Sequence, residues 1–278
     1  MAMFLMVLYI IFWGATVVDI SEVVNGGVGN SILSCASLLV ILTVSAYLGR
    51  FFASKRKNND KLDDDVKIIL GAILSLLGLL IGFVLSISIN GYNQRQQTEE
   101  NEAIAIGNAY QRIQLLDQSE QEVAIEVLQQ YLSARIAFFT TGVSDDNHKS
   151  GEVSLDKQTT LWRIGVQAVE KSPTPAILSV LTAFSDLYST QQKTLSSWRH
   201  QIPNAAWFLL IFFAISSNAL LGYTMHESQQ RNKVILILPF LTTLALFMIA
   251  EIDIPGEGII HVSPDDLLSI KNYLLRSK

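Results

Sequence analysis

The chain has 278 residues, of which 50% are hydrophobic and only 16% are charged, a composition typical of an integral membrane protein rather than a soluble domain. Its net charge of -5 at pH 7, with no face rich in lysine and arginine, excludes a general nucleic-acid-binding protein, because neutralising phosphates requires clustered cations. The single cysteine excludes an internal disulfide framework, a thiolate metal cluster and a paired redox motif.

The N-terminal stretch 1–18 is uniformly apolar and carries no charge. It is therefore neither an amphipathic surface helix nor a cationic targeting peptide. Its length is at the lower limit for crossing the hydrocarbon core of a bilayer. We predict a fifth, N-terminal transmembrane helix here, with an interfacial helix as the alternative.

Four further apolar stretches are long enough to cross a bilayer as helices. At about 1.5 Å per residue, the three longest reach roughly 28–33 Å and contain no Asp, Glu, Lys, Arg or His. The fourth is shorter, and charged residues flank it at both ends. The four stretches are residues 31–49, 68–89, 204–225 and 234–250. They predict an all-α integral membrane protein with a transmembrane hairpin over 31–90 and another over 204–252.

Basic residues indicate the orientation of these spans. The loop 50–67 contains six Lys and Arg residues, whereas residues 19–30 contain none. Because short cytoplasmic loops are enriched in Lys and Arg, we expect loop 50–67 to be cytoplasmic, in a multi-pass protein of the cell (inner) membrane. Residues 91–203 and the C-terminal tail 253–278 are then extracytoplasmic.

Residues 91–203 form a separate acidic domain with 9 Lys and Arg against 13 Asp and Glu, and their periodicity is helical throughout. Ser119 and Glu122 are spaced as a capping box at the start of one helix. We expect a polar loop at 143–154, and a further helix that ends before Pro173. A four-helix bundle continuous with the second and third core spans is the simplest packing.

The last helix of this domain starts at Pro175 and carries a seam of mostly apolar residues at alternating steps of four and three. The seam leads through Pro203 into the third core span, so we predict one long helix that can kink at this proline. The seam residues are Ile177, Leu181, Phe184, Tyr188, Gln191, Leu195, Trp198 and Ile202.

Small and weakly polar residues recur every three or four positions along the second core span, so they share one helix face. Such a face can allow close helix packing, or it can line a permeation path or an oligomer axis. The residues of this small-residue face are Gly71, Ser75, Gly78, Gly82, Ser86 and Asn90.

The spans contain no ionisable acid or base in their middle, which argues against a proton-coupled pump. The four histidines are scattered, and the chain has no nucleotide-binding loop, Ser-His-Asp signature or zinc-protease motif. We therefore predict a protein that is not an enzyme and that has no cofactor and no metal site.

Three groups of residues resemble the bestrophin-like domain family, a group of uncharacterised and mostly bacterial membrane proteins. The first group follows the second core span, the second leads into the third core span, and the third follows the last span. Together they cover roughly residues 31–275. The residues that carry the resemblance are Glu102, Gly107, Tyr110 and Arg112, then Arg199, Pro203 and Trp207, and finally Glu251, Asp253, Pro255 and Gly258.

This resemblance implies a four-span core with an all-helical domain between the second and third core spans. The family is distantly similar to bestrophins, which are pentameric anion channels whose helical domain is cytosolic. The chain departs from bestrophins by its N-terminal apolar stretch, by the lack of a recognisable acidic calcium-binding cluster and by its predicted orientation.

Together these observations predict a homo-oligomer in the lipid bilayer that passes inorganic ions, anions above all, passively. The alternative is a membrane-anchored helical sensor or scaffold without transport activity. No nucleic acid is expected as a partner.

Overall fold

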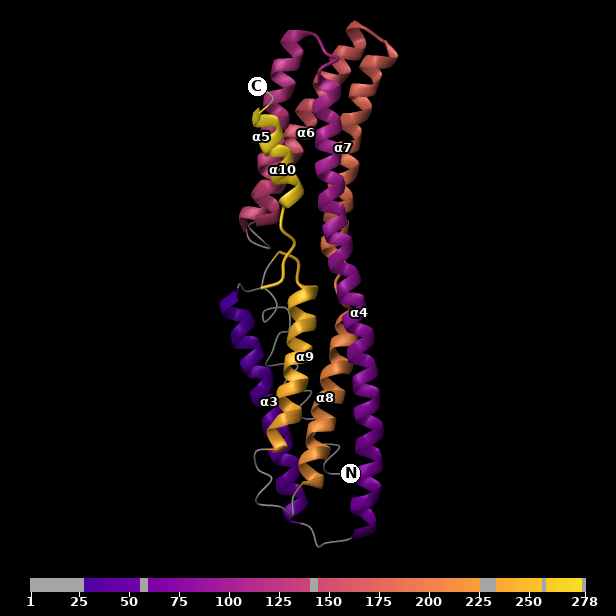
Figure 1. Cartoon of the computed structure of the whole chain (residues 1–278), viewed down its shortest axis with the longest axis vertical. Coiled ribbons are helices and arrows are strands. Elements are labelled where there is room, and N and C mark those ends of the chain that lie inside the picture. The colour runs from indigo at the N-terminus through magenta and orange to yellow at the C-terminus, as the bar shows by residue number, and fades with distance from the viewer. Residues whose placement is uncertain (1–27, 56–59, 141–144, 226–233, 257–258, 277–278) are drawn as a thin grey trace. The chain divides into compact units, whose positions relative to one another are not determined.

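The computed structural model describes residues 28–55, 60–140, 145–225, 234–256 and 259–276. The predictions for residues 1–18 and for Gly258 lie outside these ranges. Within them every regular element is helical (Figure 1), which confirms the predicted all-α class. In chain order the helices are α3 (Val28–Ser54), α4 (Asp60–Ile113), α5 (Gln118–Thr140), α6 (Asp145–Lys171), α7 (Pro175–Arg199), α8 (Asn204–Thr224), the 3-10 helix η2 (Val234–Leu236), α9 (Ile237–Asp253) and α10 (Asp265–Arg276).

The chain divides into two compact units. The membrane unit comprises Met1–Ile89 and Ile202–Ile260, and the domain unit comprises Asn90–Gln201 and His261–Lys278. Helix α4 contributes its first part to the membrane unit and its last part to the domain unit.

Four helices of the described chain are long and apolar enough to cross a membrane, which confirms the four predicted core spans. Helix α4 has 54 residues, so it is about 80 Å long, whereas the hydrocarbon core is only about 30 Å thick. Its charge-free stretch 68–89 is the part that crosses. The charged residues from Arg95 onward therefore lie outside the hydrocarbon region.

Helices α3 and α8 make the closest helix contact in the described membrane unit. A Cβ atom placed on Gly49 would lie 1.9 Å from the carbonyl oxygen of Ala219, and one placed on Gly222 would lie 1.8 Å from that of Ala46. Ser45 of α3 also donates a hydrogen bond to a backbone carbonyl oxygen of α8 at 2.9 Å. Two glycines thus allow two backbones to touch, the usual device for packing helices in lipid.

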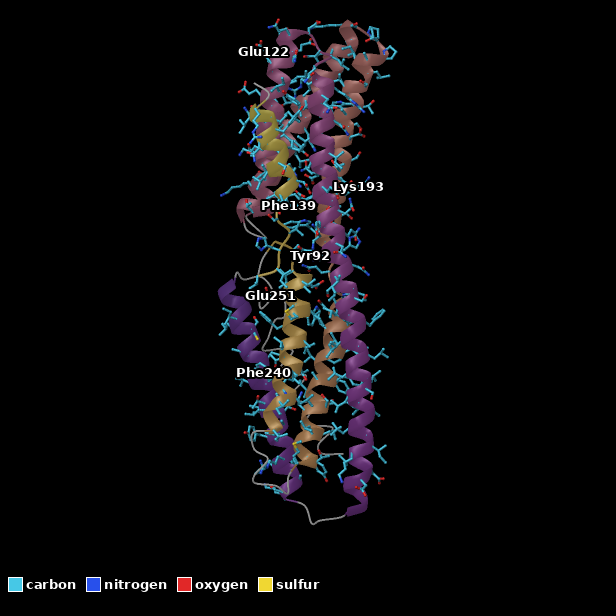
Figure 2. All side chains as sticks on the ribbon, viewed as in Figure 1. Tyr92, Glu122, Phe139, Lys193, Phe240 and Glu251 are labelled. Carbon is cyan, nitrogen blue, oxygen red and sulfur yellow. The ribbon has the colours of Figure 1, made fainter. Side chains whose placement is uncertain are left out.

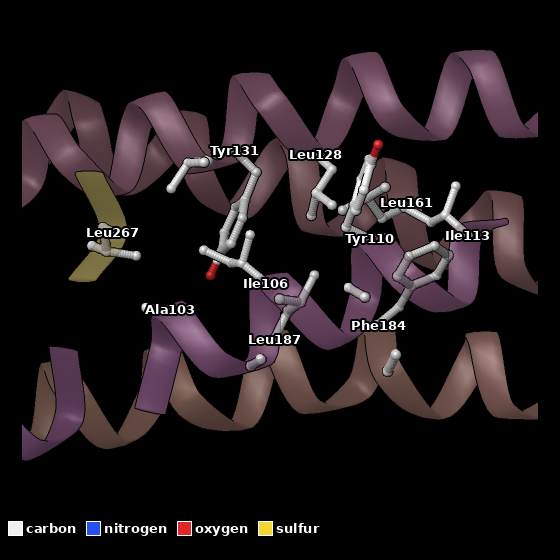
Figure 3. Close-up of a cluster of buried hydrophobic side chains, with 14 of the residues drawn as sticks. Ala103, Ile106, Tyr110, Ile113, Leu128, Tyr131, Leu161, Phe184, Leu187 and Leu267 are labelled. Carbon is white, nitrogen blue, oxygen red and sulfur yellow. The ribbon is translucent and has the colours of Figure 1, made fainter. Parts of the chain in front are cut away.

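The core of the domain unit contains side chains from five helices (Figure 3). Four of these helices, α4 to α7, were expected from the sequence. The fifth is α10, which lies in the segment predicted as a tail and buries Leu267 and Leu274. Labelled members of the core are Ala103, Ile106, Tyr110, Ile113, Leu128, Tyr131, Leu161, Phe184, Leu187 and Leu267.

Two predicted loops are shorter than expected. Helix α6 begins at Asp145, so most of the predicted loop 143–154 is helical. Ser154, at the end of this range, is buried and accepts a hydrogen bond from the side-chain amide of Gln191 at 2.9 Å. The basic loop 50–67 is also largely helical, because α3 continues to Ser54 and α4 begins at Asp60.

Two helix ends also differ from the prediction. Helix α5 begins at Gln118, so Ser119 lies inside the helix rather than at a cap. Helices α7 and α8 are separate, because α7 ends at Arg199 and Pro203 occupies the N-cap position of α8. Proline lacks an N–H and disfavours helical geometry in the preceding residue, which explains the break.

The start of α7 and most of its seam agree with the prediction. Pro175 lies in the first turn, and the hydroxyl of Thr174 accepts a hydrogen bond from the backbone N–H of Ile177. Gln191 is fully buried within the seam. Tyr188, in contrast, is exposed, and Leu187 takes its place in the core.

Candidate functional site

The small-residue face of α4 is exposed along its whole length in the single chain. A Cβ atom added to Gly71, Gly78 or Gly82 would have no neighbouring atom within 4 Å. The face therefore does not serve close packing against the described helices of its own chain, unlike Gly49 and Gly222 in the α3–α8 contact.

The membrane part of α4 contacts its own unit along one side of the helix. Leu70, Leu77 and Val84 are buried and repeat every seven residues. At 100° per residue these three side chains lie on one side of the helix, and the small-residue face lies away from them. Bulky apolar residues beside that face are also exposed, including Leu79 at 69% and Phe83 at 64%. A large part of the α4 surface is therefore open to lipid or to other subunits.

Glu102, a residue of the family motif, forms a buried ion pair in the domain unit. The Nε and Nη2 atoms of Arg135 on α5 donate hydrogen bonds to its two carboxylate oxygens at 2.7 and 2.8 Å. Both side chains are completely buried. Burial alone would lower the pKa of Arg135, but the charge and hydrogen bonds of Glu102 outweigh burial and raise the pKa. The guanidinium group therefore stays charged.

Aromatic rings surround the guanidinium group of Arg135. Its central carbon lies 4.3 Å from the ring centroid of Phe138 and 5.7 Å from that of Phe139. The indole ring of Trp198 packs on both phenylalanines, with centroid distances of 4.6 and 5.6 Å. Cation–π contacts thus supplement the ion pair in a site without solvent.

A buried polar network crosses the domain core next to this ion pair. The hydroxyl of Tyr131 lies 3.3 Å from Oε1 of Gln191 and accepts a hydrogen bond from Nε2 of Gln158 at 3.2 Å. Gln191 in turn donates to Ser154. Burial raises the pKa of Tyr131 well above its ordinary value, so the hydroxyl remains protonated and donates to Gln191. The network connects α5, α6 and α7.

The remaining motif residues of α4 contact two other helices. Gly107 faces α10, since an added Cβ atom would meet the side chain of Ile270 at 3.4 Å. Tyr110 is buried and packs edge-on against Tyr273 of α10, with ring centroids 6.3 Å apart. Arg112 donates a hydrogen bond to the backbone carbonyl of Ser179 on α7 at 3.1 Å. The motif thus holds α4 against its neighbours in the domain unit.

Glu99 is a further buried carboxyl group on α4. It is 1% exposed and accepts a hydrogen bond from the backbone N–H of Leu267, in the first turn of α10, at 2.9 Å. Burial raises the pKa of Glu99 to about 7; the Leu267 hydrogen bond lowers it, whereas contact with the carboxyl of Asp266 and the charge of Glu102 raise it. In the sequence, Glu99 lies four residues before the core residue Ala103 and therefore on the same face of α4. This spacing was the sequence signal for the burial of Glu99.

The motif after the last span forms backbone hydrogen bonds within the membrane unit. Both carboxylate oxygens of Asp253 accept from the N–H of Ile202, at 3.1 and 3.2 Å, in the break between α7 and α8. Glu251, labelled on α9 in Figure 2, is buried and accepts from the N–H of Ile259 at 2.6 Å. Pro255 is buried in the turn that follows. These acids therefore fix the backbone where α9 ends.

The motif before the third core span has a more peripheral position. Arg199 is exposed in the last turn of α7. The carbonyl oxygen of Pro203 accepts hydrogen bonds in the first turn of α8, including one from the backbone N–H of Trp207 at 3.4 Å. Trp207 is half-buried against the core of the membrane unit.

Within the described ranges, no three His, Cys, Asp or Glu side chains are grouped so that they could hold a metal ion.

The chain belongs to the bestrophin-like domain family. The family model, described as the bestrophin-like domain, matches residues 35–267, which is more than four fifths of the chain. This match confirms the resemblance inferred from the three motif groups. No curated protein matches the chain.

Solved structures share the fold. A crystal structure of a membrane protein is 12% identical, with a TM-score of 0.62, and the match covers 88% of this chain and 98% of the other. Two crystal structures of variants of a bacterial bestrophin homologue from Klebsiella pneumoniae are each 10% identical, with TM-scores of 0.61. They cover 86% and 88% of this chain, and each match covers 97% of the homologue. The chain is thus a bestrophin-type multi-pass membrane protein in its fold.

Proposed function

We propose that the chain is one subunit of a homo-oligomeric channel that passes anions passively. The observation that carries the proposal is the exposed small-residue face of α4 in a chain whose fold is that of bestrophin homologues. Small residues leave room for a pore, and spans without acidic or basic side chains in their middle offer no site there for coupling transport to protons. Subunits that meet around an axis would also cover the bulky apolar residues that α4 exposes.

Anion flux from proteoliposomes tests conduction, and adjacent positions on α4 test which face lines the path. In a Cys35→Ser background, the chain has no other cysteine. We expect Gly82→Cys to lose anion flux when a charged, water-soluble thiol reagent is added. The neighbouring variant Phe83→Cys points about 100° away around the helix, and we expect it to keep its flux.

The two variants separate the possible results. Inhibition of Phe83→Cys alone would place a different face of α4 at the path. Absence of flux from well-folded oligomers under every anion gradient would contradict the channel and favour the sensor or scaffold alternative. The separation of α7 from α8 does not favour that alternative, because a helix break interrupts the predicted continuous seam.

We also propose that the domain unit is extracytoplasmic in the cell (inner) membrane. The support is the positive-inside rule. Arg50, Lys55, Lys67 and the basic residues between them lie in the loop that joins the first two core spans, which this rule assigns to the cytoplasm. The domain unit follows the second of these spans and is then on the opposite side of the membrane. A reporter enzyme fused after Lys278 tests this proposal, since α10 belongs to the domain unit and ends near the C-terminus. Activity of fused alkaline phosphatase, which requires export from the cytoplasm, would support the proposal. Fluorescence of a fused protein that fluoresces only in the cytoplasm would contradict it.

A further inference from the structure

Helices α3 and α9 pack against each other in the membrane unit and leave a groove between them. The groove has a volume of about 390 Å³, within the roughly 300–1,000 Å³ of small-molecule sites. Its α9 side chains, including Phe240 (labelled in Figure 2), are 54–57% exposed. The residues that line the groove are Leu39 and Thr43 of α3, Leu236 of η2, and Ile237, Phe240 and Leu241 of α9. All of them except Thr43 are hydrocarbon side chains.

The groove lies at the depth of the hydrocarbon core, because its lining residues belong to the charge-free stretches 31–49 and 234–250. Lipid or protein therefore fills it. One turn of a helix about 10 Å wide takes up roughly 420 Å³, so the groove has room for less than one turn. A flexible acyl chain suits this volume better than another transmembrane helix.

Arg50 lies at the end of the groove on the same helix face. It follows Thr43 by seven residues and Leu39 by eleven. At 100° per residue the three side chains start within about 40° of one another around α3, and Arg50 is about 10 Å nearer the end of the helix. Arg50 is half-buried, and it is the first charged residue after the charge-free stretch 31–49. The order along α3, apolar first and then cationic, matches the order of an acyl chain and a phosphate in a phospholipid.

The charges beside the groove favour a negatively charged lipid. Helix α3 contains no Asp or Glu, and the stretch 234–250 contains none either. Lys55 follows Arg50, and its ammonium group lies 4.4 Å from the ring centroid of Phe51. A guanidinium group can bind a phosphate through two hydrogen bonds. A lipid whose headgroup is anionic as a whole gains this attraction without a cationic group of its own next to Arg50.

We propose that the α3–α9 groove is a binding site for an anionic phospholipid, with one acyl chain along the groove and the phosphate at Arg50. The bound chain covers the exposed side chains of Phe240 and Leu241. The proposal goes beyond the proposed channel and does not depend on ion conduction. It distinguishes one specific lipid from the lipids that surround the spans, because the specific lipid stays bound in detergent.

Photolabelling of the full-length protein in detergent micelles tests the site. The probe is a phosphatidylglycerol that carries a diazirine in one acyl chain, and peptide mapping locates the label. We expect label on residues 39–43 and 236–241. Unlabelled phosphatidylglycerol should displace it at a concentration lower than that of phosphatidylcholine, on the order of fivefold for one cationic contact.

Two pairs of variants test the two parts of the site. Thr43→Trp fills the groove and should lose most of the label, whereas Val44→Trp points about 100° away, at a position that is already exposed, and should keep it. Arg50→Gln should abolish the preference for phosphatidylglycerol. Lys67→Gln is its control, because it removes an exposed cation from α4, and it should keep the preference.

The wild-type competition needs no variant, so it remains decisive if a variant does not fold. Equal displacement by the two lipids would overturn the role of Arg50 and the anionic headgroup. Absence of label from both segments would mean that another part of the chain or another subunit covers the groove. Label that Thr43→Trp and Val44→Trp reduce equally would indicate only the lipids that surround the spans, and would also overturn the proposal.

Discussion

The carboxylate of Glu102 on α4 and the guanidinium group of Arg135 on α5 form a two-point ion pair from which solvent is completely excluded. The pair joins a family-motif residue to a helix that starts only after the motif ends. A buried ion pair contributes little net stability compared with apolar side chains, yet removing one partner leaves an uncompensated charge. We therefore expect its main role to be specifying which helix faces pack together.

The first prediction concerns this pair. Glu102→Gln leaves the buried charge of Arg135 without its counterion and should reduce the free energy of unfolding by about 3–5 kcal/mol. Glu100→Gln is the matched control, because Glu100 is exposed on the same helix. Thermal unfolding in detergent, followed by tryptophan fluorescence, measures both.

The double variant Glu102→Leu with Arg135→Met tests whether the stability lost in Glu102→Gln comes from the uncompensated charge of Arg135. It removes both charges and fills the space with apolar side chains, so most of the lost stability should return. A double variant that is as unstable as Glu102→Gln would mean that the pair contributes more than charge compensation.

The spans could be predicted from the sequence because a helix in lipid must be long, apolar and uncharged, and those properties are local. The partner of Glu102 could not, because Arg135 is 33 residues away on another helix and the pairing depends on how the helices pack. Helix α10 was missed for a related reason. It is short, and its apolar residues are buried only because they pack against α5 and against the face of α4 that includes Gly107 and Tyr110.

Small residues in the spans illustrate the same limit. The spacing of glycines and serines on α4 predicts a face, but spacing does not say what the face meets. In the single chain that face is open, whereas the close contact is made by Ala46 and Gly49 against Ala219 and Gly222. A pair of small residues three positions apart on each of two spans was the sequence signal for this contact.

The second prediction follows from that comparison. Gly49→Ala places a methyl group against a backbone carbonyl oxygen of α8 that no side-chain rotation can move. It should cost about 3 kcal/mol or more and reduce the yield of monodisperse protein. Gly78→Ala adds the same methyl group where no atom lies within 4 Å, so it should leave the stability of the single chain unchanged. Equal melting temperatures for the two variants would contradict the α3–α8 contact.

The third prediction tests the polar network of the domain core. Tyr131→Phe removes the hydroxyl that contacts Gln158 and Gln191, so two buried amides lose a hydrogen-bond partner. The expected cost is about 1–3 kcal/mol in the free energy of unfolding. Tyr188→Phe is the control, because Tyr188 is exposed on α7. A Tyr131→Phe protein as stable as this control would show that the network contributes no net stability.

The last prediction concerns Asp253 at the end of α9, which can stabilise the chain as a hydrogen-bond acceptor or as a negative charge. Its oxygens accept the backbone N–H of Ile202, which lies in the break before Pro203. If accepting that N–H is its role, Asp253→Asn should be close to the wild type, because the amide oxygen can still accept. Asp253→Ala leaves a buried N–H without an acceptor and should lose about 1–3 kcal/mol. Thermal unfolding of the three proteins separates the roles, since an Asp253→Asn protein as unstable as Asp253→Ala would mean that the negative charge, rather than the acceptor, stabilises this junction.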